Sequence, residues 1–295
     1  MVLTVIGTWP FAFKAVEVTA RFLSTPCNVV DAVEAGINEI EQSYQLASVG
    51  CGGKRNAEGI LEQDAAIMNG ADLSFGSVTA LQGISRPISV AKAVMEVSPH
   101  SMLTGEGALK FAIQQGFKVE DKLMKPQTPG VPSHTGIHDT LGVLAVKDEH
   151  VCAGVSTSGM AGKFPGRVGD SALPGCGLYA DANVGAACST GHGDEILKFC
   201  PSFKVVQFLE QNLTPQEACE RTIREILERL QRLGKNQFEM AVMAVDMQGN
   251  FGTAGTVSSV KDRQTGEIYD GFPHVVWTEG MNKAEIKVQS PCIIK

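Results

Sequence analysis

Thr140 stands where a polar stretch meets an apolar run, in the segment "GIHDTLGVLAV" (Gly136–Val146). A threonine hydroxyl is a weak nucleophile at neutral pH unless a base removes its proton. Cutting the peptide bond before Thr140 would supply that base, because the freed α-amino group has a pKa of about 7.7–8.0 and belongs to the same residue. Asp139 and His138, directly upstream, could polarise or strain this bond in the uncut chain. The alternative interpretation is a strand that simply begins on a threonine after a turn aspartate.

A second group of chemically competent residues lies in "GRVGDS", which begins at Gly166. The Arg167 guanidinium is a planar fork that can bind a carboxylate with two hydrogen bonds. Asp170, three residues later, could bind an ammonium group, and Gly169 leaves room for a ligand to approach the backbone. Together Arg167 and Asp170 could hold the charged end of a free amino acid. The alternative is a solvated Arg–Asp pair in a loop, which contributes little to stability.

Hydroxyl residues also close two apolar segments. "GVSTSG" carries Ser156–Ser158, with Thr157 at its centre, and "CSTGHGD" carries Ser189 and Thr190 before Gly191. A hydroxyl next to a backbone N–H at the end of a strand can form an oxyanion hole. The alternative is that these are ordinary serine and threonine residues at strand ends.

Three further motifs are less informative. Trp9, in "GTWPF", either covers a pocket or packs against neighbouring side chains. His192 is typical of a turn or helix-cap histidine, and Asp194 and Glu195 beside it do not complete a metal-binding spacing. The glycine-rich "GCGGKRNAEG" lacks the spacing of a phosphate-binding loop. We therefore expect neither a metal nor a cofactor.

Composition limits the class of protein and its partners. The chain has 295 residues, of which 43% are hydrophobic and 19% charged, so we expect one large globular α/β domain spanning 1–295. The net charge of −7 and the absence of a basic block argue against a nucleic-acid partner. No apolar run reaches the ~18 residues that span a bilayer, and no secretory signal is recognisable, which favours the cytoplasm. Eight scattered cysteines give no zinc signature, and we expect mostly reduced thiols.

The elements that must position these residues follow from periodicity and caps. Alternating or continuous apolar runs predict strands at 2–6, 64–70, 75–81, 140–147, 151–159 and 184–191, and a hairpin over 240–255. Helical spacing predicts helices at 11–22, 29–43, 87–97, 105–115 and 215–233. Thr104 and Thr214 are expected caps, and Glu217 completes a capping box with Thr214. The proline-bearing stretch 118–138 shows no periodicity and predicts an exposed connector. This order indicates a layered α/β protein with largely antiparallel sheets.

These motifs, in this order, resemble the glycosylasparaginase (aspartylglucosaminidase) family of N-terminal nucleophile hydrolases. The matching segments are "TWPF", "SVGCGG" with "DAAIMNG", "HDT" before a strand, "STSG", "GRVGDS", "PGCGLYAD" and "STGHGD". They cover about Val2 to Phe251, nearly the whole chain. "TWPF" and "HDT" favour this branch over the related plant-type asparaginases and isoaspartyl peptidases, which share "GRVGD".

The resemblance implies a four-layer αββα sandwich and a precursor that cuts itself between Asp139 and Thr140, giving an α chain 1–139 and a β chain 140–295. The new N-terminal Thr140 would attack the side-chain amide of an asparagine that carries N-acetylglucosamine. A β-aspartyl enzyme would form, and its hydrolysis would release aspartate. The implied self-cleavage residues are His138, Asp139 and Thr140.

The resemblance also assigns the remaining site residues by position. Thr157 would support the nucleophile, and Thr190 with Gly191 would form the oxyanion pair. Arg167 would hold the substrate α-carboxylate and Asp170 its α-amino group. Trp9 would belong to the substrate pocket, and Ser48 would lie close to the scissile bond.

This chain differs in several sequence features from the animal lysosomal members of the family. The connector before His138 is shorter, their signal peptide is not evident, and the cysteines do not follow their disulfide pattern. Lysosomal location follows only from the resemblance. Free asparagine or β-aspartyl peptides are alternative substrates, and an uncleaved binding protein is an alternative of another class. The resemblance also implies a homodimer of αβ units, with no membrane and no nucleic acid as partner.

Overall fold

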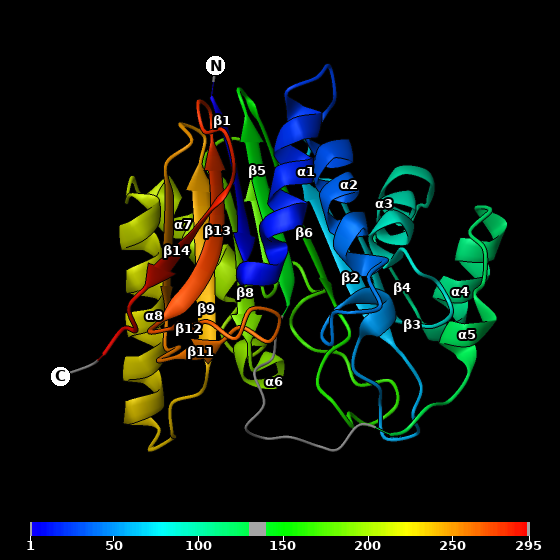
Figure 1. Ribbon diagram of the computed structural model, residues 1–295. Coiled ribbons are helices and arrows are strands. Elements are labelled where there is room, and N and C mark those ends of the chain that lie inside the picture. Colours follow the sequence, from blue (N-terminus) through cyan, green and yellow to red (C-terminus); the bar gives the residue numbers. More distant parts are fainter. Residues whose placement is uncertain (1, 130–139, 294–295) are drawn as a thin grey trace.

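Two β-sheets pack face to face between two layers of helices (Figure 1). The computed structural model describes residues 2–129 and 140–293. His138 and Asp139, expected in self-cleavage, therefore lie outside the described residues. The architecture is the expected αββα sandwich.

The larger sheet places the strand that follows Thr140 near its centre. Within the described residues its eight strands run in the spatial order β14 (Glu285–Gln289), β13 (Phe272–Thr278), β1 (Leu3–Thr8), β5 (Leu141–Lys147), β6 (His150–Thr157), β2 (Gln63–Asn69), β3 (Phe75–Leu81) and β4 (Met102–Thr104). Neighbours are antiparallel except β3 and β4. The sheet therefore interleaves groups of strands that precede Thr140 with groups that follow it.

The smaller sheet is antiparallel throughout. Its strands in the described chain are, in order, β10 (Phe251–Gly255), β9 (Met240–Asp246), β8 (Gly185–Gly191) and β7 (Leu178–Asp181). A separate short pair joins β11 (Val260–Lys261) to β12 (Ile268–Tyr269). The segment that ends in Thr190 and Gly191 is therefore a strand, as its apolar run predicts.

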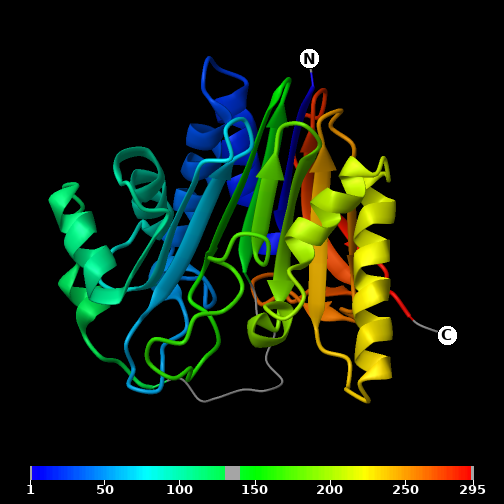
Figure 2. The same ribbon diagram turned by 180° about the vertical axis from the view of Figure 1, so that it is seen from behind.

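Helices cover the outer faces of both sheets (Figures 1 and 2). On the larger sheet and beside it lie α1 (Phe13–Leu23), α2 (Val29–Glu41), α3 (Pro87–Val97), α4 (Gly105–Gln114) and the short α5 (Asp121–Met124). On the side of the smaller sheet lie α6 (Gly193–Ile196), α7 (Pro201–Glu210) and α8 (Pro215–Arg232). Short 3-10 turns occupy Pro10–Ala12 and Gly50–Gly52. Among the described helices, none combines the length and apolar character needed to cross a membrane.

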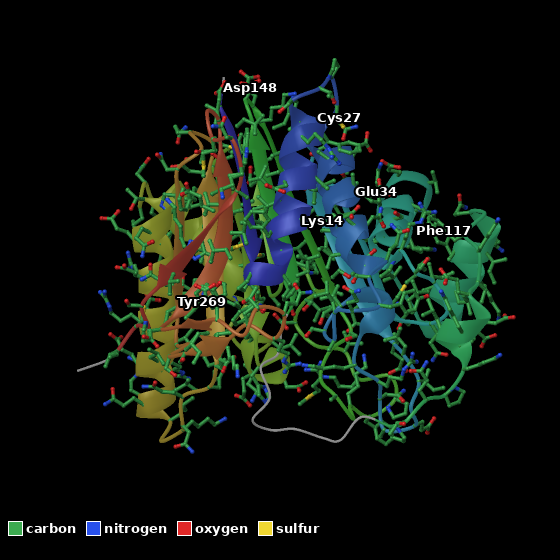
Figure 3. All side chains as sticks on the ribbon, in the orientation of Figure 1. Lys14, Cys27, Glu34, Phe117, Asp148 and Tyr269 are labelled. Atoms are coloured by element: carbon green, nitrogen blue, oxygen red, sulfur yellow. The ribbon has the colours of Figure 1, made fainter. Side chains whose placement is uncertain are left out.

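The apolar run of β5 is explained by burial on both of its faces. Val143 and Ala145 point into the core beneath α1–α3, whereas Leu144 and Val146 point into the core between the sheets. A strand covered on both faces reads as a continuous apolar run rather than an alternating one. Each fully buried valine or leucine side chain contributes roughly 1.5–3 kcal/mol, so β5 is firmly anchored. Side chains fill the space between all layers (Figure 3).

Local sequence signals agree with most helix ends. At α8, Thr214 accepts the Glu217 N–H and Glu217 in turn accepts the Thr214 N–H, which is the expected capping box. Thr104 occupies the cap position of α4, but its hydroxyl bonds Thr79 instead of the helix. The expected connector from residue 118 is not wholly exposed, because Leu123 of α5 is buried against Cys51 and Leu61.

Candidate active site

Thr140 lies buried at the start of β5, with 4% of its surface exposed. Its Oγ1 is 3.0 Å from Ser171 Oγ, and its backbone N–H donates to Thr190 Oγ1 at 3.2 Å. Its carbonyl accepts a short hydrogen bond from the Thr8 hydroxyl of β1. Side chains from both sheets therefore fix the residue expected to act as the nucleophile.

The neighbouring strands explain why Thr140 is held at this position. Thr8 Oγ1 also accepts the Gly142 N–H at 2.8 Å, so one hydroxyl ties β1 to two positions of β5. Gly142 itself allows the sheets to approach, because a Cβ there would lie 2.6 Å from Cys188 Sγ of β8. The far end of β5 leads to Asp148, which lies with Cys27 at the opposite end of the molecule (Figure 3).

Trp9 contacts the site through Thr190. Its Nε1 donates to Thr190 Oγ1 at 2.9 Å, and its ring packs edge-on against Phe272 with centroids 4.9 Å apart. The φ of Trp9 is +62°, a region that non-glycine residues rarely occupy. Trp9 also lines a pocket of about 110 Å³ together with Ser48. Both expectations for Trp9, packing and lining a pocket, are thus seen together.

A small pocket of about 20 Å³ brings most of the expected residues together. Its lining comes from the residue before β5, from the ends of β6 and β8, from the glycine-dense loop after β6, and from the first residue of α6. The lining residues are Thr140, Thr157, Gly159, Met160, Arg167, Gly169, Asp170, Ser171, Gly191 and Gly193. Of the expected site residues within the described chain, Trp9 and Thr190 adjoin this pocket by hydrogen bonds and Ser48 lines the neighbouring one.

Arg167 is paired with Asp194 rather than with Asp170. Its Nε and Nη2 donate to the two carboxylate oxygens of Asp194 at 3.1 and 2.9 Å. The guanidinium is thus already arranged for bidentate contact with a carboxylate. A Cβ on Gly169 would lie 2.9 Å from Arg167 Nη1, so this glycine gives the guanidinium its space.

Asp170 is buried, and its carboxyl is incompletely paired. Among the described residues, no hydrogen-bond donor reaches its Oδ2. Burial raises the pKa of Asp170 to about 7, and Asp194 and Asp64 add to that increase while Arg167 opposes it. A buried carboxylate with an open acceptor is suited to an ammonium ligand, since the ligand would supply the missing donor.

The hydroxyls at the strand ends divide into two groups. Thr157 faces the pocket and accepts the Gly159 N–H at 3.0 Å. Ser158 instead bonds the Ser48 carbonyl, and Ser189 pairs with Ser202 at 2.8 Å. These two serines stabilise loops outside the pocket.

Ser171 lines the pocket and contacts the Thr140 hydroxyl, although sequence reasoning assigned it no role. It follows Asp170 directly, and its contact with the Thr140 hydroxyl joins residues 31 positions apart. The signal available was its place in "GRVGDS", one residue beyond the expected clamp. No metal-binding group of three or more His, Cys, Asp or Glu side chains occurs in the described residues, and all eight cysteines lie there as free thiols.

Comparison with known proteins is consistent with this arrangement. Residues 11–129 and 122–265 match the profile of the asparaginase family. An N(4)-(beta-N-acetylglucosaminyl)-L-asparaginase of Elizabethkingia miricola is 38% identical over 295 residues, covering 95% of this chain and 83% of its own length. The enzyme of the same name from Rattus norvegicus is 33% identical, covering 85% of this chain and 83% of its own length. An isoaspartyl peptidase/L-asparaginase of Danio rerio is 34% identical, with 84% of this chain and 83% of its own length covered.

Proposed function

The chain belongs to the asparaginase family, and on that premise we propose that it is an autoprocessed amidohydrolase of the glycosylasparaginase type. Its substrate would be asparagine linked to N-acetylglucosamine through the side-chain amide. The observation that carries this proposal is the shared pocket, which Thr140, Arg167 and the incompletely paired Asp170 line together.

Maturation would begin with attack by Thr140 Oγ1 on the Asp139 carbonyl carbon. The peptide C–N bond breaks, an ester links Asp139 to the Thr140 oxygen, and water then hydrolyses that ester. The products are a carboxylate on Asp139 and a free α-amino group on Thr140. This amino group can remove the proton from the Thr140 hydroxyl, which a threonine inside a chain has no built-in means to do.

Substrate recognition would rest on the charged head of the asparagine. Arg167 would bind its α-carboxylate with the fork that now binds Asp194. The Asp170 carboxylate would accept a hydrogen bond from its α-ammonium. With both groups fixed, the side-chain amide carbon would lie near Thr140, which raises the effective concentration of the reacting groups.

Turnover would proceed through a covalent intermediate. Thr140 Oγ1 attacks the amide carbon, and the developing oxyanion receives hydrogen bonds from the Thr190 hydroxyl and the Gly191 N–H. The Trp9 and Thr140 N–H groups that donate to Thr190 Oγ1 orient this hydroxyl. The C–N bond breaks, the glycosylamine departs with a proton, and water hydrolyses the β-aspartyl ester to release aspartate.

Purified protein tests the proposal directly. Intact mass should show two fragments that meet at Asp139–Thr140, and Thr140→Ala should remain a single inactive chain. A full-length wild-type chain with full amidase activity would contradict the mechanism. An intact chain that binds aspartate without turnover would instead indicate a non-catalytic binding protein.

An isoaspartyl peptidase or L-asparaginase activity is the second candidate, because a relative of that name is 34% identical to this chain. Comparing kcat/KM for aspartylglucosamine, β-aspartyl dipeptides and free asparagine separates the two. We also propose that two αβ units associate as a homodimer. Sedimentation analysis showing only single αβ units would contradict this assembly.

A further inference from the structure

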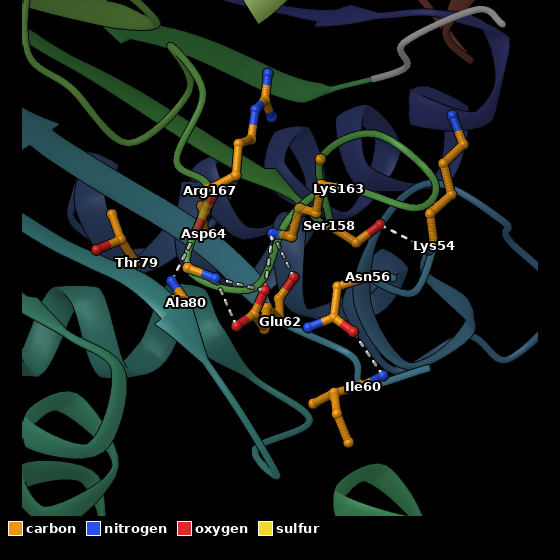
Figure 4. Close-up of polar contacts among 12 residues, drawn as sticks. Lys54, Asn56, Ile60, Glu62, Asp64, Thr79, Ala80, Ser158, Lys163 and Arg167 are labelled. Atoms are coloured by element: carbon orange, nitrogen blue, oxygen red, sulfur yellow. Dashed lines mark hydrogen bonds and ion pairs between the residues drawn. The ribbon is translucent and has the colours of Figure 1, made fainter. Parts of the chain in front are cut away.

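A buried ion pair joins Glu62 to Lys163, which belongs to the same loop as Arg167 (Figure 4). The Lys163 side chain has no exposed surface and that of Glu62 only 4%. Lys163 Nζ donates to the Glu62 carbonyl at 3.2 Å and lies 3.9 Å from Glu62 Oε2. Charged groups are rarely buried this completely unless they are paired, and pairing alone often does not stabilise a fold. The pair therefore invites a functional explanation.

Glu62 holds the backbone N–H of Gly166, the residue immediately before Arg167. Both of its carboxylate oxygens accept the Gly166 N–H, at 3.0 and 3.2 Å. Gly166 has a φ of +82°, and the Arg167 N–H closes a turn onto the Phe164 carbonyl at 2.9 Å. The direction in which the Arg167 side chain leaves this turn thus depends on the Glu62 carboxylate.

Lys163 and the Arg167 guanidinium meet at Gly159. A Cβ on Gly159 would lie 3.1 Å from Arg167 Nη1 and 3.4 Å from Lys163 Nζ, so both cations lie close to this glycine. Asp64, fully buried nearby, balances them: Lys163 and Arg167 both oppose the increase that burial causes in the pKa of Asp64. Lys163 and Arg167 thus share the buried Asp64 as a negative neighbour, and Lys163 is also paired with Glu62.

We propose that Glu62 and Lys163 are positioning residues for Arg167, which set its guanidinium where it receives the α-carboxylate of the substrate. This inference rests on the proposed function, because it takes Arg167 to be the carboxylate-binding group. A purely structural pair would affect unfolding but not the recognition of one substrate group. The test therefore measures that recognition separately from stability.

The main variant is Glu62→Gln, which removes the charge while keeping an oxygen near Gly166. The substrates are aspartylglucosamine and its analogue with an α-carboxamide in place of the α-carboxylate. We expect KM for the carboxylate substrate to rise about ten- to a hundredfold, as when a remote change misplaces a binding group. KM for the carboxamide analogue and the extent of cleavage before Thr140 should stay near the wild-type values. The preference for the carboxylate therefore falls.

Glu34→Gln is the matched control, because Glu34 also pairs with a lysine, Lys92, but lies on α2 away from the pocket (Figure 3). It should leave both KM values unchanged. The double variant Glu62→Gln/Lys163→Met removes both charges together, so that neither is left buried alone, and covers the case in which a single variant fails to fold. It should lose the same substrate preference.

A lowered melting temperature with unchanged substrate preference, in the single or the double variant, would overturn the proposal. Titration calorimetry with aspartate distinguishes a failure of this positioning role from a failure of the proposed function. Wild-type protein that binds aspartate without turnover contradicts the proposed function alone, and equal aspartate affinity in Glu62→Gln contradicts the positioning role. Wild-type protein that neither binds nor turns over contradicts both.

Discussion

Thr140 and Ser171 place two hydroxyls 3.0 Å apart in a buried pocket, and the proposed cleavage would make Thr140 a chain end. The sequence points to Thr140 because a threonine nucleophile needs a base. Cleavage of the preceding peptide bond would provide that base as a free α-amino group. The sequence does not point to Ser171, since a contact over 31 residues depends on how the loop after β6 returns to the pocket. Likewise Asp194, which occupies the Arg167 fork, comes 27 residues later on α6. The sequence was enough to predict which side chains could do chemistry. Which residues contact one another depends on the tertiary structure.

The Ser171 contact predicts an effect on turnover rather than on binding. Ser171→Ala should lower kcat by up to about tenfold, the value of one hydrogen bond to the nucleophile, with KM unchanged. Steady-state kinetics with aspartylglucosamine checks this. Ser202→Ala is the control, because Ser202 is in a similar buried hydroxyl pair with Ser189 outside the pocket. Equal kcat in Ser171→Ala and wild type would remove Ser171 from the mechanism.

Asp170 predicts a pH dependence of substrate binding. In the ligand-free protein its pKa is raised to about 7, so below that pH the carboxyl is protonated and must lose its proton to accept an ammonium. Aspartate affinity should therefore fall by up to about tenfold per pH unit below 7 and level off above it. Titration calorimetry measures the aspartate affinity across a range of about two pH units on either side of that pKa. A flat profile would contradict an ionised Asp170 as the ammonium-binding group.

The same burial predicts that Asp170 destabilises the folded protein. Since the folded pKa is raised from 3.8 to about 7, the folded state binds more protons than the unfolded chain between those values. The stability that the protonated carboxyl contributes is therefore lost as pH rises through this window. Asp170→Asn, compared in an uncut Thr140→Ala background, should raise the free energy of unfolding at pH 8 by the order of a few kcal/mol. The gain should disappear at pH 4.

At the scale of elements, the strongest periodic and capped segments are where sequence and structure agree. β5, β6, β8 and α8 follow their apolar runs or capping residues. β13 (Phe272–Thr278) was not predicted, although it pairs with β1 beside the site. It contains Pro273, which weakens a strand signal, and its pairing lies more than 260 residues along the chain from β1. Pairing at that separation cannot be read from local pattern.

Gly142 lets the two sheets approach each other closely next to Thr140, and this predicts the effect of a larger residue there. Gly142→Ala would place a Cβ 2.6 Å from Cys188 Sγ, so it should cost about 1–3 kcal/mol of stability and reduce cleavage before Thr140. Gly107→Ala in α4 is the control, because no neighbouring atom lies within 4 Å of the point where its Cβ would stand, and alanine favours helices. Thermal unfolding and the cut fraction after purification measure both. A cut fraction equal to that of wild type would show that the spacing of the sheets does not set the nucleophile.

For the whole molecule, the order of strands decides what a cut at Thr140 would produce. Groups of strands from before and after Thr140 are interleaved in one sheet and meet at β13–β1, β1–β5 and β6–β2. The fragments 1–139 and 140–295 would therefore share one hydrogen-bonded sheet and both of its cores. The sequence predicted the layers and the antiparallel pairing, but this interleaving follows only from the topology.

Interleaving predicts that the fragments stay together until the protein unfolds. Size-exclusion chromatography of the cut protein should give one peak that contains both fragments. After full denaturation, recovery should rise with protein concentration, since reassembly now requires two chains, whereas uncut Thr140→Ala should refold independently of concentration. Separate fragments under native conditions would contradict the prediction.

Because Thr8 of β1 and Thr190 of β8 position Thr140, the proposed cleavage would occur only in chains that have folded correctly. Those groups meet only when distant segments have reached their places, so a chain that misses that arrangement would keep its full length. The proportion of full-length to shortened polypeptide on a gel would then count the molecules that have matured. Variants could therefore be ranked for correct folding by this ratio alone, without adding a substrate.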